Sequence, residues 1–365
     1  MSLRTIAALS ALGLILGGAS AGALEPAPQA HDPVIGTKPA QNGAVIVSLS
    51  DDTPGATIYY TTDGSAPTIA SQRYEAPFLV ASNLTVRATA IAEGLNFSSV
   101  PSQVFAPDIP ADTLVWADEF DTPGAPDPTV WGYDTGNRGF GNHELETYCA
   151  AGSAEAPCDP AQPSASVAAD GLLHIVGRRI DDHTFTSARL KSQGLFSFQY
   201  GRIEVRARVP EAQGYWPAFW TLGNNITTVD WPASGEQDIL ERVNAAKAPD
   251  WNEGSVHGVG FTGGTGLGKV YEFPAGQTAA DWHTYGMIWK PGSVAYYVDD
   301  PAHPYVTYTT DDLKPFPDAK WPFDAGQSNF LLINMAIGGD WPGSPDATTP
   351  FPAEMQVDYV RIYSN

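Results

Sequence analysis

The sequence predicts an all-β protein, and three observations lead to that fold class. Glycine and proline number 36 and 31 and are spread along the chain, which is typical of many short strands joined by turns. The segment 201–209 alternates with a period of two, which places Ile203, Val205, Ala207 and Val209 on one face of a strand. No long stretch repeats its apolar residues at the helical period of about 3.6. From residue 114 onward, strands and turn signals recur at the spacing of a β-sandwich.

Length and charge limit the architecture and the partners. A chain of 365 residues, 43% apolar, can form one large domain and a smaller one. The formal net charge is −22, with only 19 basic residues, which argues against nucleic acid or an anionic membrane as a partner. The same acidity disfavours, more weakly, a sulfated polysaccharide. A neutral ligand suits this chain best.

The N-terminus has the pattern of a secretory signal peptide over residues 1–23. Arg4 precedes an apolar run from Ile6 to Leu16, and small residues with two candidate cleavage sites follow. The run is too short to span a bilayer as an ordinary helix, and no later segment is a candidate. We therefore expect a soluble exported protein, extracellular or periplasmic.

Cys149 and Cys158 are the only cysteines of the chain. In an exported protein, two cysteines this close in sequence favour a disulfide across the intervening loop. The alternative is a pair of free thiols. We expect the disulfide to fix a loop near the ligand-binding cleft.

Residues 31–106 predict a small β-sandwich module, followed by a proline-containing linker at 107–111 and a large domain at 112–365. The run 56–68 resembles the β-sandwich module found at the C-terminus of chitobiases and attached to many bacterial glycanases. One interpretation is carbohydrate binding or positioning, with a tyrosine stacking on sugar; the candidates are Tyr59, Tyr60 and Tyr74. The other is a spacer whose tyrosines are half-buried strand residues, which we favour because tyrosine is common in strands.

Three carboxylates, Glu236, Asp238 and Glu241, lie within six residues. On a regular strand Glu236 and Asp238 share a face, whereas Glu241 points to the other. A β-bulge at Ile239–Leu240 would absorb one residue and return Glu241 to the face of the other two. The sequence therefore predicts a bulged strand that presents all three carboxylates on one side.

This arrangement suits acid-base chemistry on a glycosidic bond. Glu236 and Glu241 are then about four strand steps, roughly 13 Å, apart along the backbone, and their side chains can close most of that gap. Carboxyl groups about 5–5.5 Å apart are typical of a retaining glycosidase. Asp238 between them would add negative charge and keep one neighbour protonated near neutral pH. The alternative is an acidic edge strand with solvated carboxylates.

The residues around the carboxylates extend the pattern. Trp231 and Pro232 precede them, and His257 lies on the next expected strand. The segment resembles the bulged E-x-D-x-x-E signature of glycoside hydrolase family 16, as found in laminarinases. Further blocks resemble the same family, in family order and over essentially all of 112–365: 116–121, 141–148, 187–192, 200–204, 215–220, 281–285, 334–343 and 357–363.

The resemblance implies a jelly roll of two curved sheets, with substrate along the concave one. It makes Glu236 the nucleophile and Glu241 the acid/base, with Asp238 supporting the nucleophile. Gln237 stands where most relatives carry an aliphatic residue. A polar side chain at that position must find a buried partner or lie on a more solvated face.

A sugar cleft should combine tryptophans with a few polar groups. By motif position, Trp216 and Trp231 are the expected stacking residues. The expected hydrogen-bonding residues are Asn142, Arg189, His257 and Asn334. A core role is the alternative for each tryptophan, and we assign Trp220 to the core. His143, His174 and His183 are interpreted as ordinary surface or structural residues.

No cofactor is expected for catalysis, because the sequence has no zinc-type Cys/His spacing, no phosphate-binding loop and no Ser-His-Asp arrangement. The resemblance does suggest a structural Ca²⁺ on the convex side. Its ligands would be Glu119, the backbone carbonyl of Gly171, and Asp358. The alternative is three solvated turn residues.

The sequence thus predicts a secreted, monomeric endo-β-1,3-glucanase that acts on a β-glucan such as laminarin, with mixed-linkage β-1,3-1,4-glucan as a second candidate substrate. Two alternatives stay open. One is a galactan hydrolase of the same fold, resembling agarases or carrageenases. The other is a glucan-binding protein without activity, which the presence of all three carboxylates disfavours.

Overall fold

The computed structural model describes residues 28–105, 109–243, 250–324 and 328–365. The signal-peptide prediction and residues 107–108 of the expected linker lie outside them. The described chain is almost entirely β, as predicted, and α1 (Ile226–Val229) is its only α-helix. Short 3-10 turns are η1 (Gln41–Gly43), η2 (Gly139–Gly141), η3 (Gly263–Thr265) and η4 (Thr310–Leu313). No helix in these ranges has the length and apolar character needed to cross a membrane.

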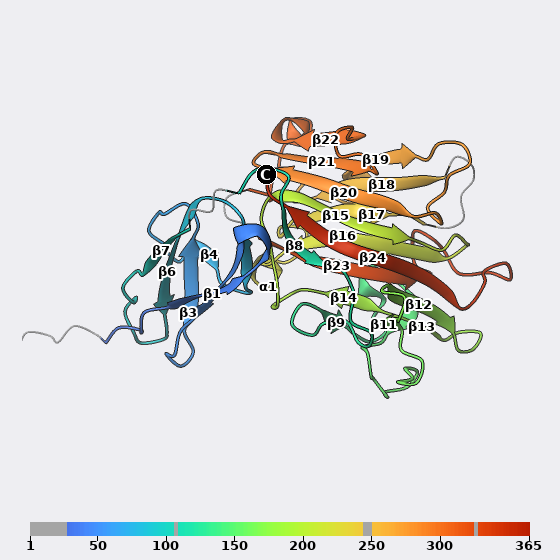
Figure 1. Ribbon diagram of the computed structural model, residues 1–365, viewed down its shortest axis with the longest axis horizontal. Helices are drawn as coiled ribbons and strands as arrows, with labels where there is room; N and C mark the ends of the chain where they lie inside the picture. The colour runs from blue at the N-terminus through green and yellow to red at the C-terminus, as the bar shows by residue number, and fades with distance from the viewer. Residues whose placement is uncertain (1–27, 106–108, 244–249, 325–327) are drawn as a thin grey trace, which may run out of the picture.

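The N-terminal module consists of two small sheets (Figure 1). One has the order β1 (Val34–Pro39), β2 (Val45–Ser50), β5 (Phe78–Val80). The other has the order β4 (Gln72–Arg73), β3 (Thr57–Thr61), β6 (Leu84–Ile91), β7 (Ser102–Phe105). Tyr60 is buried between them and stacks on Phe78 at 4.9 Å between ring centroids. Tyr60 is therefore a core residue, whereas Tyr59 and Tyr74 are partly exposed.

Two large sheets form the sandwich that follows. The outer sheet has ten strands. Its order is β10 (Glu146–Tyr148), β13 (Phe185–Ser187), β12 (Leu173–Arg179), β24 (Ala353–Tyr363), β15 (Gly201–Arg208), β20 (His283–Lys290), β21 (Ser293–Val298), β22 (Val306–Thr309). β8 (Leu114–Asp118) pairs with β24, and β11 (Ala165–Val167) pairs with β12.

The inner sheet has seven strands and carries the expected site. Its order is β19 (Leu267–Glu272), β18 (Trp251–His257), β17 (Glu236–Glu241), β16 (Tyr215–Gly223), β23 (Asn329–Ile337), β14 (Arg189–Lys191), β9 (Gly132–Asp134). Antiparallel pairing places β17, the strand with the three carboxylates, between β16 and β18.

The main core lies between the two large sheets. Val205 of β15 and Val360 of β24 belong to the same buried cluster as Phe219 of β16 and Ile333 of β23. Alternation along each strand explains this, because every second side chain points to the core and the next points away. The outward positions of the inner sheet are therefore free to form a binding surface.

The N-terminal module is packed onto the sandwich. The Leu79 N–H donates to the Ser197 carbonyl at 2.9 Å, and Leu79 joins the buried core cluster of the sandwich. The Ser328 hydroxyl accepts hydrogen bonds from Gln72 of the module and from Asn224 at the end of β16, each at 3.0 Å. These contacts hold the module against the sandwich and are compatible with both the carbohydrate-binding or positioning interpretation and the spacer interpretation.

We expect Leu79→Ala to destabilise the sandwich as well as the module. The leucine is 9% exposed and packs against the sandwich core, so its truncation should cost about 2–3 kcal/mol. Thermal unfolding would measure the loss. Val104→Ala is a matched control, since that valine of β7 is 66% exposed. Equal melting temperatures of the two variants would show that the interface adds no stability.

Candidate active site

The predicted bulge is present in β17. In the ladder between β16 and β17, Leu240 pairs with Phe219 and Asp238 pairs with Trp220, so Ile239 has no partner of its own. The extra residue reverses the alternation once, as a bulge does. All three carboxylates consequently lie opposite the same face of β16, at Ala218 for Glu241, Trp220 for Asp238 and Leu222 for Glu236.

These carboxylates line a cleft of about 920 Å³ on the outward face of the inner sheet. Every residue that the sequence analysis assigned to catalysis or sugar binding lines the same cleft: Asn142, Arg189, Trp216, Trp231, Glu236, Asp238, Glu241, His257 and Asn334. They come from five different strands and from the loops between them. The structure therefore brings the whole predicted set together, while their individual roles stay predictions.

Each glutamate of the pair is held by one indole. The Trp231 Nε1–H donates to Glu236 Oε2 at 2.7 Å, and the Trp216 Nε1–H donates to Glu241 Oε1 at 3.0 Å. These bonds restrict the rotamers of both carboxyl groups. The two tryptophans expected to stack on sugar thus also orient the two reactive groups.

Asp238 lies between the glutamates and is more deeply buried than either. The Ser255 hydroxyl donates to its Oδ2 at 2.6 Å, and His257 Nε2 lies 3.1 Å from the same oxygen. Ser255 and His257 lie on β18, and both contact Asp238 on β17, beside Glu236. These side-chain contacts join β17 to β18. Burial lowers the pKa of His257, but the hydrogen bond and charge of Asp238 outweigh it and raise the pKa to about 9. The imidazole is therefore a cation near neutral pH.

Burial raises the pKa of both glutamates. Burial, and then the charge of Asp238, raise the pKa of Glu236 to about 8, against the opposing charge of His257 and the hydrogen bond from Trp231. Burial, Asp238 and Glu236 together raise the pKa of Glu241 well above its ordinary value. The raised pKa keeps Glu241 protonated, as a proton donor requires. The charge of His257 and the hydrogen bond from Trp231 favour the ionised form of Glu236, as a nucleophile requires.

Trp220 is a correction to the sequence analysis, which placed it in the core. It lines the cleft, its Nε1–H donates to Asn334 Oδ1 at 2.8 Å, and the Arg189 guanidinium lies over its ring at 4.7 Å. The sequence does indicate that Trp220 faces the cleft. Trp216, Ala218 and Trp220 follow one another at intervals of two residues on one strand, so their side chains share a face.

The sequence analysis also missed Glu144, which lines the wall beyond Trp220. Its carboxylate accepts from the Tyr148 hydroxyl at 2.8 Å and from the Asn142 side-chain amide at 3.3 Å. The Asn334 amide in turn donates to the Tyr148 hydroxyl at 3.2 Å. Two predicted sugar-binding residues are therefore fixed by a carboxylate and a phenol that lie in the block 141–148.

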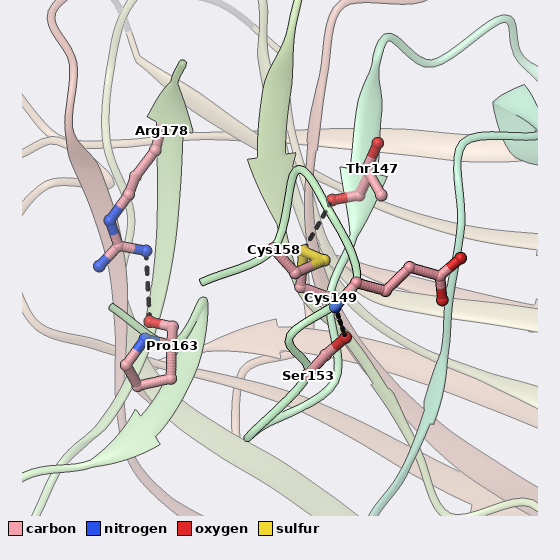
Figure 2. The surroundings of a disulfide bond; sticks show 7 residues. Thr147, Cys149, Ser153, Cys158, Pro163 and Arg178 are labelled. Carbon is pink, nitrogen blue, oxygen red and sulfur yellow. Dashed lines mark hydrogen bonds between the residues drawn. A yellow bond between two sulfur atoms is a disulfide. The ribbon is translucent and has the colours of Figure 1, made fainter. Parts of the chain in front are cut away.

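The predicted disulfide is present directly after this wall (Figure 2). Cys149 and Cys158 are bonded, with their Cα atoms 5.7 Å apart. Cys149 follows Tyr148, so the closed loop begins next to the hydroxyl that binds Asn334 and Glu144. The expected location near the cleft is confirmed.

Gln237 finds buried partners for its side-chain oxygen, whereas its Nε2 has no hydrogen-bond partner among the described residues. It is fully buried behind the carboxylates, and its Oε1 accepts from the Thr221 hydroxyl and from the Asn329 amide, each at 3.0 Å. Three strands, β16, β17 and β23, are thereby joined by polar side chains beneath the cleft. The prediction of a buried polar partner is confirmed.

The residues proposed for a structural Ca²⁺ do not fit a cation in this arrangement. Both carboxylate oxygens of Glu119 accept from the Arg361 guanidinium at 2.8 Å, and Asp358 pairs with Arg206. Gly171 lies in a turn with φ of +76°. Carboxylates that face guanidinium groups already have their counter-ions, which disfavours Ca²⁺ here. The alternative of three solvated turn residues does not describe them either, because Glu119 and Asp358 are ion-paired and Asp358 lies on β24.

The three histidines assigned no site role are not among the residues that line the cleft. His143 is exposed and paired with Asp340, and His183 is exposed in a turn. His174, on β12, lies between Asp170 and Glu354.

We expect Glu241→Gln to raise the melting temperature by roughly 2–6 °C near pH 7. Above the ordinary carboxyl pKa of 4.5, the folded protein keeps a proton on Glu241 that the unfolded chain releases, so stability falls as the pH rises. Glutamine removes this dependence, and the advantage of the variant should grow from pH 5 to pH 8 in thermal unfolding. The exposed Glu272→Gln is the control; a gain that does not depend on pH would contradict the explanation.

Comparison with known proteins identifies both parts of the chain. Residues 37–102 match the chitobiase/beta-hexosaminidase C-terminal domain, and residues 163–361 match glycosyl hydrolases family 16. Both matches fall inside the predicted domain bounds. A beta-glucanase of Rhodothermus marinus is 39% identical over 263 residues, which cover 68% of this chain and 84% of the relative.

Solved structures agree. The catalytic domain of an endo-1,3-beta-glucanase (laminarinase) from Thermotoga petrophila is 37% identical, with a TM-score of 0.61 over 69% of this chain and 98% of that one. The laminarinase from Rhodothermus marinus is 39% identical, with a TM-score of 0.58 over 69% and 97%. With this extent of similarity and with the bulged carboxylate strand in place, the chain belongs to family 16 of the glycosyl hydrolases and carries a chitobiase-type module before its catalytic domain.

Proposed function

We propose that this protein is a secreted endo-β-1,3-glucanase that cuts laminarin-like glucans with retention of configuration. The observation that carries the proposal is the arrangement of Glu236 and Glu241. Both lie on the cleft face of one bulged strand, each is held by an indole, and burial raises the pKa of each. The named relatives act on β-glucan or on its β-1,3 bonds, which supports the substrate class.

The chemistry follows from the positions of the groups. The Glu236 carboxylate attacks the anomeric carbon while Glu241 protonates the leaving oxygen, which gives a glycosyl-enzyme ester. Glu241, now a carboxylate, removes a proton from water, and the water oxygen displaces Glu236 from the anomeric carbon. The His257 cation and the Asp238 carboxylate form an ion pair beside the nucleophile, so their charges offset each other. These steps require two carboxyl groups and no cofactor.

The extent of the cleft supports cleavage within a chain. Its lining runs from Arg189 on β14 to Gly268 on β19, across six adjacent strands of the inner sheet. At about 4.8 Å between strands this is roughly 24 Å, which accommodates several sugar residues. A polymer can therefore lie across the sheet with its scissile bond at β17.

Charge supports a neutral glucan over a sulfated galactan. The cations among the described residues that line the cleft are Arg189 and His257, and the whole chain has a formal net charge of −22. This acidity disfavours a sulfated polymer as the substrate. Mixed-linkage β-1,3-1,4-glucan is a second neutral candidate. Export is supported by the signal pattern of residues 1–23 and by the disulfide.

We expect Glu236→Gln to lower the release of reducing sugar from laminarin about a thousand-fold or more, because the amide cannot act as the nucleophile. Glu272→Gln should retain activity. The assay should include barley mixed-linkage glucan, agarose and carrageenan, with affinity electrophoresis on laminarin as a binding control. Cleavage of the galactans alone would refute the substrate; binding of glucan by the wild type without cleavage would refute the enzyme activity.

We expect His257→Gln to move the acid limb of the kcat/KM profile to higher pH, by about 0.5–1 unit. The imidazolium opposes the rise in the pKa of Glu236, so a neutral side chain raises that pKa further and more of the nucleophile is protonated at a given acidic pH. His283→Gln is the control, since this buried histidine pairs with Asp299 in the outer sheet. An acid limb that moved to lower pH would contradict the assignment.

A further inference from the structure

The block 141–148 contains a buried acid that the mechanism above does not use. Glu146 is the first residue of β10 and is 0% exposed. It does not line the cleft, whereas Glu144, two residues earlier, does. An ionised carboxylate without access to water is strongly destabilising, so Glu146 needs either a cationic partner or a proton.

The two oxygens of Glu146 have different surroundings. Its Oε2 accepts from the Ile337 N–H, at the end of β23, at 2.6 Å. Its Oε1 has no donor partner anywhere in the described ranges. The Glu146 carboxyl group also forms a side-chain hydrogen bond with the carboxyl group of Glu144. Two carboxyl groups can form such a bond only when one of them is protonated, so the pair holds a proton.

The contacts of Glu144 indicate which acid carries that proton. Glu144 already accepts from the Tyr148 hydroxyl at 2.8 Å and from the Asn142 amide at 3.3 Å, which favours its ionised form. Burial, and then the charge and the hydrogen bond of Glu144, raise the pKa of Glu146 well above its ordinary value. Glu146 is therefore a neutral acid near neutral pH, and its O–H donates to the Glu144 carboxylate.

Glu144 is the centre of the hydrogen bonds in this wall of the cleft. The Tyr148 hydroxyl, which donates to it, accepts from the Asn334 amide at 3.2 Å. Asn334 in turn accepts from the Trp220 indole at 2.8 Å. Asn142, Asn334 and Trp220 all line the cleft. The orientation of three cleft residues thus depends on one carboxylate.

We propose that Glu146 is a positioning residue for substrate binding, because as a neutral donor it fixes the carboxylate of Glu144. Glu144 then holds the amide of Asn142 directly, and that of Asn334 through Tyr148, in the orientation that meets the sugar. This inference rests on the proposed function. Glu146 touches neither the substrate nor the reacting groups, so its loss should weaken binding and leave the chemical step nearly unchanged.

The charges around the pair make the proton necessary. The charge that acts most strongly on Glu146 is the negative charge of Glu144, so ionisation of Glu146 would place two negative charges side by side. The wall would then lose its donor and gain a repulsion. The surrounding charged and titratable groups are Glu144 and Tyr148 of the same segment, Arg189 of β14, whose charge acts on Tyr148, Arg179 of β12, which lies over the Phe185 ring that pairs with Glu146, and the exposed pair of His143 and Asp340.

Glu146→Leu and Glu146→Gln separate hydrogen bonding from packing. Leucine fills a similar space and donates nothing, so the KM for laminarin should rise about ten-fold while kcat changes by less than about two-fold. In Glu146→Gln the amide Nε2 donates to Glu144 and the amide oxygen accepts from the Ile337 N–H, so both constants should stay within about two-fold of the wild type. Thr147→Ala is the matched control, because its side chain points to the other face of β10.

The dependence on pH tests the proton itself. The ratio of the wild-type KM to that of Glu146→Gln should increase as the pH rises, because only the wild type can ionise at this position. Thermal unfolding gives a readout without substrate. Above the ordinary carboxyl pKa of 4.5, the folded protein keeps a proton on Glu146 that the unfolded chain releases, so wild-type stability falls as the pH rises. The melting-temperature advantage of Glu146→Gln should therefore grow from pH 5 to pH 8.

Equal KM values for Glu146→Leu and the wild type would overturn the inference, as would a Glu146→Gln variant as impaired as Glu146→Leu. If Glu146→Leu does not fold, the pH dependence of Glu146→Gln decides, and an advantage that does not grow with pH would overturn the neutral donor. A wild type that binds laminarin without cutting it would refute the proposed activity alone, and weaker binding by Glu146→Leu in affinity electrophoresis would still support the role of Glu146. A wild type that neither cuts nor binds laminarin would refute both.

Discussion

The single residue inserted at Ile239 determines whether the cleft can work. Without it, Glu241 would point into the core between the sheets, where an ionisable group is strongly destabilising. With it, three carboxylates face the same side within one strand, and Leu240 and Ile239 fill the core behind them. The neighbouring strands are arranged around this local irregularity. β16 supplies the indole for Glu241, β18 supplies the partners of Asp238, and β23 supplies Asn329 beneath Gln237.

Placing three acids close together raises the free energy of their ionised forms. The surroundings of each carboxyl group offset this to a different extent. The charge of His257 lowers the pKa of both glutamates, and one indole donates to each. The charges of Asp238 and Glu236 raise the pKa of Glu241, whereas the charge of Asp238 raises that of Glu236. The surroundings of two chemically identical side chains thus differ because of the strands on either side of β17.

The sequence was informative wherever a short-range rule applied. Alternation along strands and the spacing of Glu236, Asp238 and Glu241 predicted the sheet class and the bulge, and export predicted the disulfide. Alternation also places Trp220 on the cleft face, because Trp216 and Trp220 are an even number of residues apart on one strand. The sequence analysis did not apply the rule to this pair. Glu144 and Trp341, which both line the cleft, are different, because their segments meet through contacts between positions about 200 residues apart, such as the hydrogen bond from the Asp340 N–H to the Asn142 carbonyl. No local pattern reveals which distant turns meet. The residues suggested as calcium ligands show a further limit of prediction from sequence. A resemblance to a family does not reveal that Arg361 and Arg206 form ion pairs with the carboxylates of Glu119 and Asp358.

The docking of the N-terminal module affects how the enzyme can meet a solid substrate. Ser328 accepts from Gln72 of the module and from Asn224, which immediately precedes the segment with α1 and Trp231. Leu79 anchors the same module in the sandwich core. A module held this way cannot search a surface on a tether while the cleft works elsewhere. Wherever the module touches an insoluble glucan particle, the angle at which the cleft approaches that particle is fixed as well, so only chains that run in a compatible direction can enter.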